Sequence, residues 1–179
     1  MENLLHMKHI VALLFITFLY TASLAQSVDF DKKFKELNIE LLTPTKPIAN
    51  YVKAVRAGNL LFISGQGPAK ADGTYILGKV GKDLTIEEGY AAARQTAIGV
   101  LSTLKAELGD LNKIKRVVKV NGWVNCTPEF TDQPKVVNGF SDLMVAVFGE
   151  KGKHARAAMG VNALPNGMAI EVEMVVELE

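Results

Sequence analysis

Apolar residues recur at three- and four-residue steps in three segments of the chain, which is the spacing of an amphipathic helix. The longest segment starts at a Thr-x-x-Glu capping box, residues 85–88, and continues to Gly109, a residue type that commonly ends helices. A second segment covers residues 136–148 and is also followed by glycine. Residues 27–38 show the same spacing over a shorter length, before a stretch with two prolines. The pattern predicts two long helices and one short N-terminal helix.

Five further segments alternate apolar and polar residues or are rich in β-branched side chains, as strands are. Turn residues, mainly glycine, asparagine and proline, separate them. In the last segment every second residue from Ile170 to Val176 is apolar, and glutamates occupy most positions between. The predicted strands are residues 51–57, 60–64, 114–124, 155–163 and 169–178.

The predicted order is two strands, a helix, a strand, a helix and two strands, which is typical of an α+β domain built on a single sheet. We expect both helices on one face of that sheet. The alternation of residues places Met159, Val161 and Ala163 on the face opposite Arg156. Because an apolar second face needs a cover that the chain does not supply, we expect a homo-oligomer.

The N-terminus carries an uncharged apolar run, residues 10–20, which is preceded by Lys8 and followed by Ser23 and Ala25. This run is shorter than the roughly 20 residues that span a bilayer, and a signal peptidase reads small residues at two such positions. We therefore predict a signal peptide over residues 1–25, cleaved after Ala25. The mature protein is then periplasmic or secreted and has no stable membrane anchor.

This leader divides the chain into three parts. Residues 26–47 form a predicted extension, made of the short helix and a linker, and residues 48–179 form the folded domain. Met1 and Met7 are both candidate initiators, because the residues from Met7 onward make a signal peptide by themselves. The alternative to cleavage is an amphipathic or membrane-anchoring helix that stays attached.

Composition narrows the classes of function. With 49% hydrophobic and 22% charged residues, the chain is a folded protein rather than a disordered polymer. Its 20 basic and 19 acidic residues give a net charge of +1, which leaves no long basic face to follow a phosphate backbone. Nucleic acid is therefore not an expected partner.

Histidine and cysteine, the usual ligands of zinc and copper, are rare in this chain. Two of its three histidines lie in the leader, which leaves His154 and the single cysteine, Cys126. One histidine and one cysteine do not make a zinc or copper site, so no metal is expected. Gly65-x-Gly67 lacks the third glycine of a dinucleotide fingerprint, so no cofactor is expected. Cys126 is expected to be a small buried residue, and a Cys126–His154 nucleophile pair is the alternative.

Two charged residues stand out within the last two predicted strands. Arg156 lies among alanines and glycine, where a guanidinium is costly to bury without an anionic partner. Glu171 lies near the start of the last strand. Arg156 is interpreted either as an anion-binding residue or as a structural ion-pair residue, and Glu171 either as a functional carboxylate or as a solvent-facing one.

Four motifs along the chain contain or surround these two residues. They are residues 51–68 (YVKAVRAGNLLFISGQGP), Asn138 within VVNGF, residues 154–165 (HARAAMGVNALP) and residues 169–173 (AIEVE). In this order they resemble the YjgF family, whose members are also called Rid proteins or reactive intermediate deaminases and are sometimes labelled L-PSP endoribonucleases. The resemblance extends from about Ile48 to the C-terminus.

The resemblance implies a chorismate-mutase-like α+β fold and a homotrimer whose sheets pack inward as a barrel, with clefts for small ligands between subunits. It implies that Arg156 binds a substrate carboxylate and that Glu171 handles water. A cysteine that is common in the family two residues after the arginine is replaced here by alanine. The positions implied to bind substrate are Tyr51, Ser64, Gly65, Asn138 and Ala158.

The implied reaction is the hydrolysis of a small 2-imino acid to a 2-oxo acid and ammonia. A non-catalytic trimer that binds small carboxylates is the alternative, and ribonuclease activity is less favoured because the mature chain lacks two histidines and a basic cluster. If the last two strands formed a hairpin, Arg156 and Glu171 would lie on the order of 13 Å apart, at roughly 3.3 Å per residue. Either those strands are not neighbours, or the cleft takes side chains from adjacent subunits.

Overall fold

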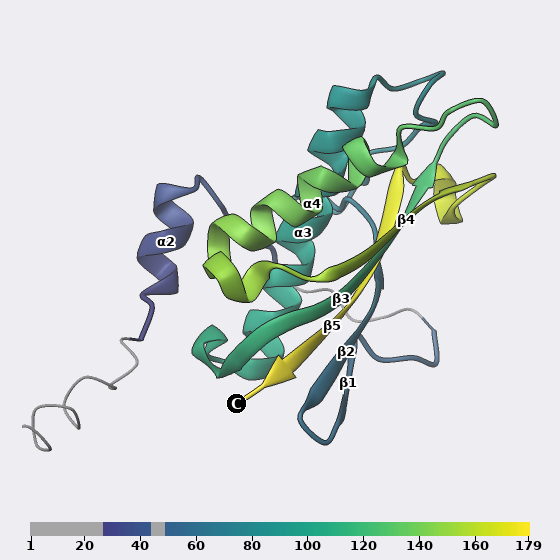
Figure 1. The fold of residues 1–179 in the computed structure, drawn as a ribbon. Coiled ribbons are helices and arrows are strands. Elements are labelled where there is room, and N and C mark those ends of the chain that lie inside the picture. Colours follow the sequence, from purple (N-terminus) through teal and green to yellow (C-terminus); the bar gives the residue numbers. More distant parts are fainter. Residues whose placement is uncertain (1–26, 44–48) are drawn as a thin grey trace, which may run out of the picture.

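Five strands form one mixed sheet, and two long helices lie on one of its faces (Figure 1). The computed structural model describes residues 27–43 and 49–179. The predicted signal peptide, its cleavage site, both candidate initiators and the two linker prolines lie outside the described residues. The α+β architecture with one sheet and both long helices on one face is confirmed, whereas export stays a prediction.

The elements follow one another in the predicted order. The strands are β1 (Ala54–Ala57), β2 (Leu60–Gln66), β3 (Ile114–Asn125), β4 (Ala155–Val161) and β5 (Ile170–Leu178). The helices are α2 (Phe30–Glu36), α3 (Ile86–Leu108) and α4 (Gln133–Phe148), and the short 3₁₀ turns are η2 (Leu111–Lys113), η3 (Gly149–Gly152) and η4 (Pro165–Gly167).

The order of strands across the sheet differs from their order along the chain. It is β1-β2-β5-β3-β4, and all neighbouring pairs are antiparallel except β3 and β4, which are parallel. β3 therefore lies between the last two strands of the chain. Of the two arrangements that the sequence left open, the structure has the one in which β4 and β5 do not pair.

The predicted signals at the helix ends are present. The Thr85 hydroxyl accepts a hydrogen bond from the Glu88 amide (3.2 Å), and the Glu88 carboxylate accepts one from the Thr85 amide (2.8 Å). Gly109 ends α3 at φ 71° and Gly149 ends α4 at φ 61°, both in the left-handed region that glycine tolerates. Local sequence therefore determines where both long helices begin or end.

The first two strands differ at their ends from the predicted ranges. β1 begins at Ala54 rather than at residue 51, because the Tyr51 amide bonds to the Ala49 carbonyl (2.8 Å) in a turn instead of to β2. β2 continues beyond the predicted end to Gln66, through a bulge in its pairing with β5. The bulge keeps residues 64 and 65 beside β5.

The fourth strand is shorter than predicted. β4 ends at Val161 rather than at residue 163, since the Asn162 carbonyl accepts a hydrogen bond from the Lys79 ammonium instead of continuing the ladder. Met159 lies opposite Trp123 in the register of β3 and β4 and faces away from the helices, as the alternation predicted. Ala163 lies beyond the strand.

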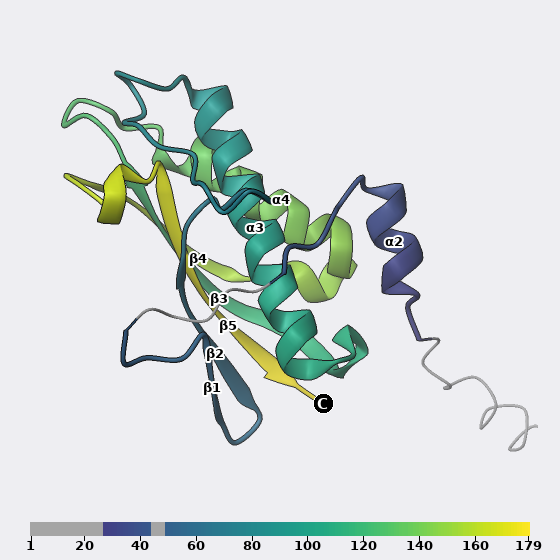
Figure 2. The same cartoon turned by 180° about the vertical axis from the view of Figure 1, so that it is seen from behind.

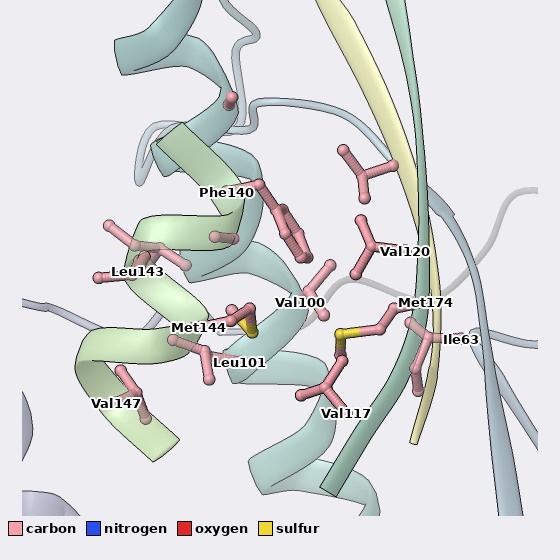
Figure 3. Packing of buried hydrophobic residues seen from close by; sticks show 14 of the residues in the cluster. Ile63, Val100, Leu101, Val117, Val120, Phe140, Leu143, Met144, Val147 and Met174 are labelled. Carbon is pink, nitrogen blue, oxygen red and sulfur yellow. The ribbon is translucent and has the colours of Figure 1, made fainter. Parts of the chain in front are cut away.

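The core lies between the helices and the sheet. α3 packs over β5 and β2, and α4 packs over β3 and β4. Figure 3 shows Phe140 of α4 and Val100 of α3 directed toward Val120 of β3 and Met174 of β5, and each of these four side chains is at most 1% exposed. This packing fixes which face of each strand is covered.

The short N-terminal helix adds a further layer. α2 lies on the outer side of the long helices, away from the sheet (Figure 2). Phe30 and Phe34 are buried, and the ring centroids of Phe30 and Phe148 are 5.6 Å apart. The chain after α2 is held by a hydrogen bond from the Leu42 amide to the Ser102 hydroxyl (2.9 Å). The prediction of a short docking helix is confirmed, and α2 docks on the helix layer.

The other face of the sheet has no cover within the described residues. One row of side chains crosses it from Val55 through Phe62 to Val175, and the first two of these are 54% and 44% exposed. A second row runs from Met159, which is 39% exposed, through Trp123 to Glu171. We call this surface the open face.

Candidate functional site

Arg156 projects from the edge strand β4 toward α4. Its Nη1 donates hydrogen bonds to Asn138 Oδ1 (2.8 Å) and to Ser141 Oγ (3.0 Å). Asn138 and Ser141 are three residues apart on α4 and therefore lie on the same side of that helix. Both contacts are to neutral acceptors, so they orient the guanidinium without neutralising its charge.

The remaining donors of Arg156 have no protein acceptor within the part of the chain that the structure describes. Nη1 uses both of its hydrogens, which leaves Nε and Nη2 with three of the five donors of a guanidinium. No aspartate or glutamate in residues 27–43 or 49–179 forms a salt bridge with Arg156. If Arg156 is a structural ion-pair residue, its acidic partner is therefore not among those residues.

Glu171 lies on the open face, beside the bulged end of β2. A Cβ placed on Gly65 would overlap Glu171 Oε1, so the absence of a side chain at residue 65 makes room for the carboxylate. The carboxylate is half-buried, and burial, followed by repulsion from Glu173, raises the pKa of Glu171 above its ordinary value. Glu171 is therefore only partly exposed to solvent, and its functional role stays a prediction.

Ser64 and Tyr51 lie near the same end of β2. The Ser64 hydroxyl donates a hydrogen bond to the Val52 carbonyl (2.7 Å), and the Ser64 amide donates to the Lys53 carbonyl (3.0 Å). With its proton committed, the Ser64 oxygen is left as an acceptor. The Tyr51 ring is exposed. Ser64 directly precedes Gly65, which lies against Glu171, and Tyr51 directly precedes Val52, the hydrogen-bond partner of Ser64.

The implied site residues thus fall into two groups that do not meet within one chain. Arg156, Asn138 and Ala158 form the first, which we call the Arg156 half-site. The second, the Glu171 half-site, consists of Tyr51, Ser64, Gly65 and Glu171.

The register of the sheet shows how far apart the two half-sites are. Arg156 is level with Val120, which is paired with Met174, three residues along β5 from Glu171. With β3 between them, the two Cα atoms are on the order of 14 Å apart, from about 4.8 Å per strand and about 3.3 Å per residue. Arg156 also points to the helix side of the sheet, whereas Glu171 lies on the open face. One small ligand cannot touch both residues of one chain.

Ser141 and His154 are polar neighbours of Arg156 that sequence reasoning did not assign to the site. The Ser141 hydroxyl lies 3.0 Å from His154 Nε2, and His154 Nδ1 lies 2.7 Å from the Gly152 carbonyl. The spacing places Ser141 on the same helix face as Asn138, one turn away, and His154 on the same side of the chain as Arg156, two residues away. It does not show that the two residues meet, because that requires α4 to lie beside β4.

The alternative pairing of Cys126 with His154 as a nucleophile is wrong. Cys126 is buried, as expected, and its sulfur lies 3.8 Å from Gln133 Nε2. It follows the end of β3, whereas His154 precedes the start of β4, and β3 and β4 are parallel. Roughly seven residues of strand, on the order of 20 Å, separate the two side chains.

Residues 27–43 and 49–179 contain no group of three or more histidine, cysteine, aspartate or glutamate side chains placed to hold a metal ion. In the same ranges no helix combines the length and the apolar character needed to cross a membrane.

The chain matches a known protein family. A model of the YjgF/chorismate mutase-like family, whose description also carries an endoribonuclease label, matches residues 33–178. Protein TCP17 from Trypanosoma cruzi is 49% identical over 145 residues, which cover 80% of this chain and 91% of that protein.

Solved structures agree with the family match. The protein Atu1372 from Agrobacterium tumefaciens, described as of unknown function, has a TM-score of 0.77 and 42% identity and covers 84% of this chain and 94% of that chain. RidA from the Antarctic bacterium Psychrobacter sp. PAMC 21119 has a TM-score of 0.55 and 26% identity, covering 78% of this chain and 98% of that chain.

Proposed function

Because this chain belongs to the YjgF/chorismate mutase-like family, as the motifs in its sequence predicted, we propose that it hydrolyses small 2-imino acids to 2-oxo acids and ammonia. Arg156 binds the carboxylate of the substrate, and Glu171 acts on the water. The observation that carries this proposal concerns Arg156: its Nη1 is held in place, while its Nε and Nη2 have no acceptor among residues 27–43 and 49–179.

The guanidinium of Arg156 suits a planar carboxylate. Nε and the adjacent hydrogen of Nη2 point in parallel, so they make two hydrogen bonds to the two carboxylate oxygens. This two-point contact orients the carbon next to the carboxylate, which in a 2-imino acid is the carbon that water attacks. An ammonium group cannot make the same contact, because it is a point charge with rotating donors.

Glu171 has the protonation behaviour that the second role requires. Its raised pKa brings the carboxyl group closer to the range in which it both accepts and returns a proton. In the reaction the water oxygen bonds to the imine carbon and one water proton goes to Glu171. That proton passes on to the nitrogen as the C=N bond becomes a single bond. The second water proton, now on the hydroxyl group, then moves to the nitrogen through Glu171, and the C–N bond breaks as the C=O bond forms, so that the nitrogen leaves as ammonia.

The proposal includes a homotrimer in which one subunit completes the site of its neighbour. The two half-sites lie on different sides of one sheet, so a ligand on Arg156 of one copy needs Glu171 from another copy. The exposed Val55, Phe62 and Met159 make the open face suitable for burial between copies. The clefts then lie between subunits, where Tyr51, Ser64 and the backbone around Ala158 also contact the ligand.

The experiment follows ammonia release from an imine made in situ by an amino-acid oxidase, measured above the spontaneous rate in buffer. We expect the wild type to accelerate release and Arg156→Ala to fall to the spontaneous rate. Arg156→Lys should recover only part of the activity. We also expect 2-oxobutyrate to raise the melting temperature of the wild type but not of Arg156→Ala, with the unliganded proteins within about 2 °C of each other.

A matched control removes an arginine elsewhere. Arg94 on α3 donates from Nη2 to the Leu37 carbonyl (3.0 Å), on the α2 side of the helices. Arg94→Ala should keep the stabilisation by 2-oxobutyrate. If the wild type is stabilised by the oxo acid but does not accelerate ammonia release, the protein is a binder of small carboxylates and not a deaminase. If Arg156→Ala is stabilised as well as the wild type, the proposed anchor is wrong.

A further inference from the structure

Ser141 and His154 connect Arg156 to the backbone of the turn before β4. Arg156 Nη1 donates to Ser141 Oγ (3.0 Å), and Ser141 Oγ lies 3.0 Å from His154 Nε2. His154 Nδ1 in turn lies 2.7 Å from the Gly152 carbonyl oxygen. Four groups from α4, η3 and the start of β4 thus form one continuous chain of hydrogen bonds.

The chemistry of the groups sets the direction of each hydrogen bond. A carbonyl oxygen only accepts, so His154 Nδ1 carries the hydrogen and donates to Gly152. In the neutral imidazole Nε2 then holds a lone pair and accepts from the Ser141 hydroxyl. A guanidinium only donates, so the Ser141 oxygen accepts from Arg156. Of the two neutral tautomers of His154, only this one is consistent with all three bonds.

The surroundings of His154 favour its neutral form. Burial lowers the pKa of His154 below its ordinary value, the hydrogen bond to Gly152 opposes this in part, and the charge of Arg156 lowers the pKa further. The lowered pKa favours the neutral ring, whose Nε2 holds the lone pair that accepts from Ser141.

We propose that Ser141 and His154 are positioning residues for the substrate carboxylate, which hold the Arg156 guanidinium with its Nε and Nη2 edge turned to the ligand. This inference rests on the proposed role of Arg156. A long side chain that moves freely loses rotamer freedom when it binds a ligand, and this loss weakens binding. The chain from Gly152 to Arg156 restricts the side chain before the ligand arrives.

The first test measures binding of 2-oxobutyrate to the full chain by calorimetry. Ser141→Ala should bind about three- to tenfold more weakly than the wild type. The factor is modest because Ser141 makes one hydrogen bond to the charged Arg156 and none to the ligand itself. His154→Asn keeps a donor near the Nδ1 position but has no acceptor for Ser141, so it should weaken binding by the same factor. His154→Gln places its amide oxygen near the Nε2 position and should bind within about twofold of the wild type.

A double-mutant cycle separates positioning from general destabilisation. Since His154 acts through Ser141, the pair Ser141→Ala with His154→Asn should bind no more weakly than either single variant. Ser102→Ala is the matched control. Ser102 is buried on α3 and accepts from the Leu42 amide (2.9 Å), so its loss should lower the melting temperature and leave the affinity for 2-oxobutyrate unchanged.

A second measurement needs no ligand. Side-chain ¹⁵N NMR of His154 at pH 7 should show a protonated Nδ1 and an unprotonated Nε2, and a ring with hydrogen on Nε2 would overturn the inference. If the wild type binds 2-oxobutyrate and Arg156→Ala does not, but Ser141→Ala and His154→Asn bind like the wild type, the positioning role is wrong while the proposed function stands. If the wild type does not bind the oxo acid, both are wrong.

Discussion

The two faces of the sheet differ in how their side chains are partnered. On the helix-covered face of β5, Ile170, Val172, Met174 and Val176 are at most 1% exposed. On the open face of the same strand, glutamates alternate with these residues, and Glu173 accepts a hydrogen bond from Asn121 (2.7 Å). One strand therefore carries a completed apolar core on one side and a mixed, partly exposed surface on the other.

Because of this difference, we expect substitutions on one face to affect stability and substitutions on the other to affect assembly. The covered face acquires all of its contacts from the same chain, so its substitution should affect folding directly. The open face holds Phe62 and Glu171, residues that in our proposal gain their partners from a neighbouring copy. Substitutions there should change assembly and ionisation more than the fold of the subunit.

The largest effect is expected at the centre of the covered face. Met174→Ala removes a side chain that is 1% exposed and leaves a cavity between β5 and the helices, which should lower the free energy of unfolding by about 2–5 kcal/mol. Urea unfolding at one fixed protein concentration measures it, because the stability of an oligomer depends on concentration. Val145→Ala on the outer side of α4 should change stability by less than about 0.5 kcal/mol. Equal losses for the two variants would contradict the contrast.

A smaller effect on the fold, but a large one on assembly, is expected at Phe62. Phe62→Glu places a carboxylate between Val55 and Val175, where burial between subunits would leave the charge without a partner. Light scattering should then give the mass of a monomer, while circular dichroism keeps the wild-type spectrum. Val145→Glu is the control and should remain a trimer. A trimeric Phe62→Glu protein would show that the open face is not the interface.

The smallest expected effect concerns two glutamates on β5, whose pKa values are shifted in opposite directions. The pKa of Glu171 is raised, so its contribution to stability is present below the ordinary value of 4.5 and is lost as the pH rises through the raised pKa. Hydrogen bonds from Lys115 and Arg116 hold the pKa of Glu177 below 4.5, so its contribution is present above 4.5 and is lost as the pH falls through the lowered pKa.

Melting temperatures of the two glutamine variants test this difference. Relative to the wild type, Glu171→Gln should become more stable as the pH rises from about 4 to about 8. Glu177→Gln should instead become less stable than the wild type as the pH rises from about 3 to about 6, with most of the change at the lower end. Parallel pH profiles for the two variants would mean that the half-buried position of Glu171 does not determine its ionisation.

The sequence predicted the elements and the family, because both depend on short-range patterns. The capping box at residues 85–88 and the glycines after each long helix act within a few residues, and the alternation of β5 assigns each residue to a face without knowledge of the neighbours. The motifs around Arg156 and Glu171 indicated the family that the comparisons then confirmed. The roles of the site residues themselves stay predictions.

Only the tertiary structure decided how these parts meet. The insertion of β3 between β4 and β5 separates Arg156 from Glu171, and nothing in either strand encodes that order, because strand order depends on how the chain buries its helices over the whole sheet. The contact of Ser141 with His154 likewise requires α4 to pack beside β4. Periodicity shows which face a residue occupies, whereas which residues share a hydrogen bond across elements depends on distances that exist only after packing.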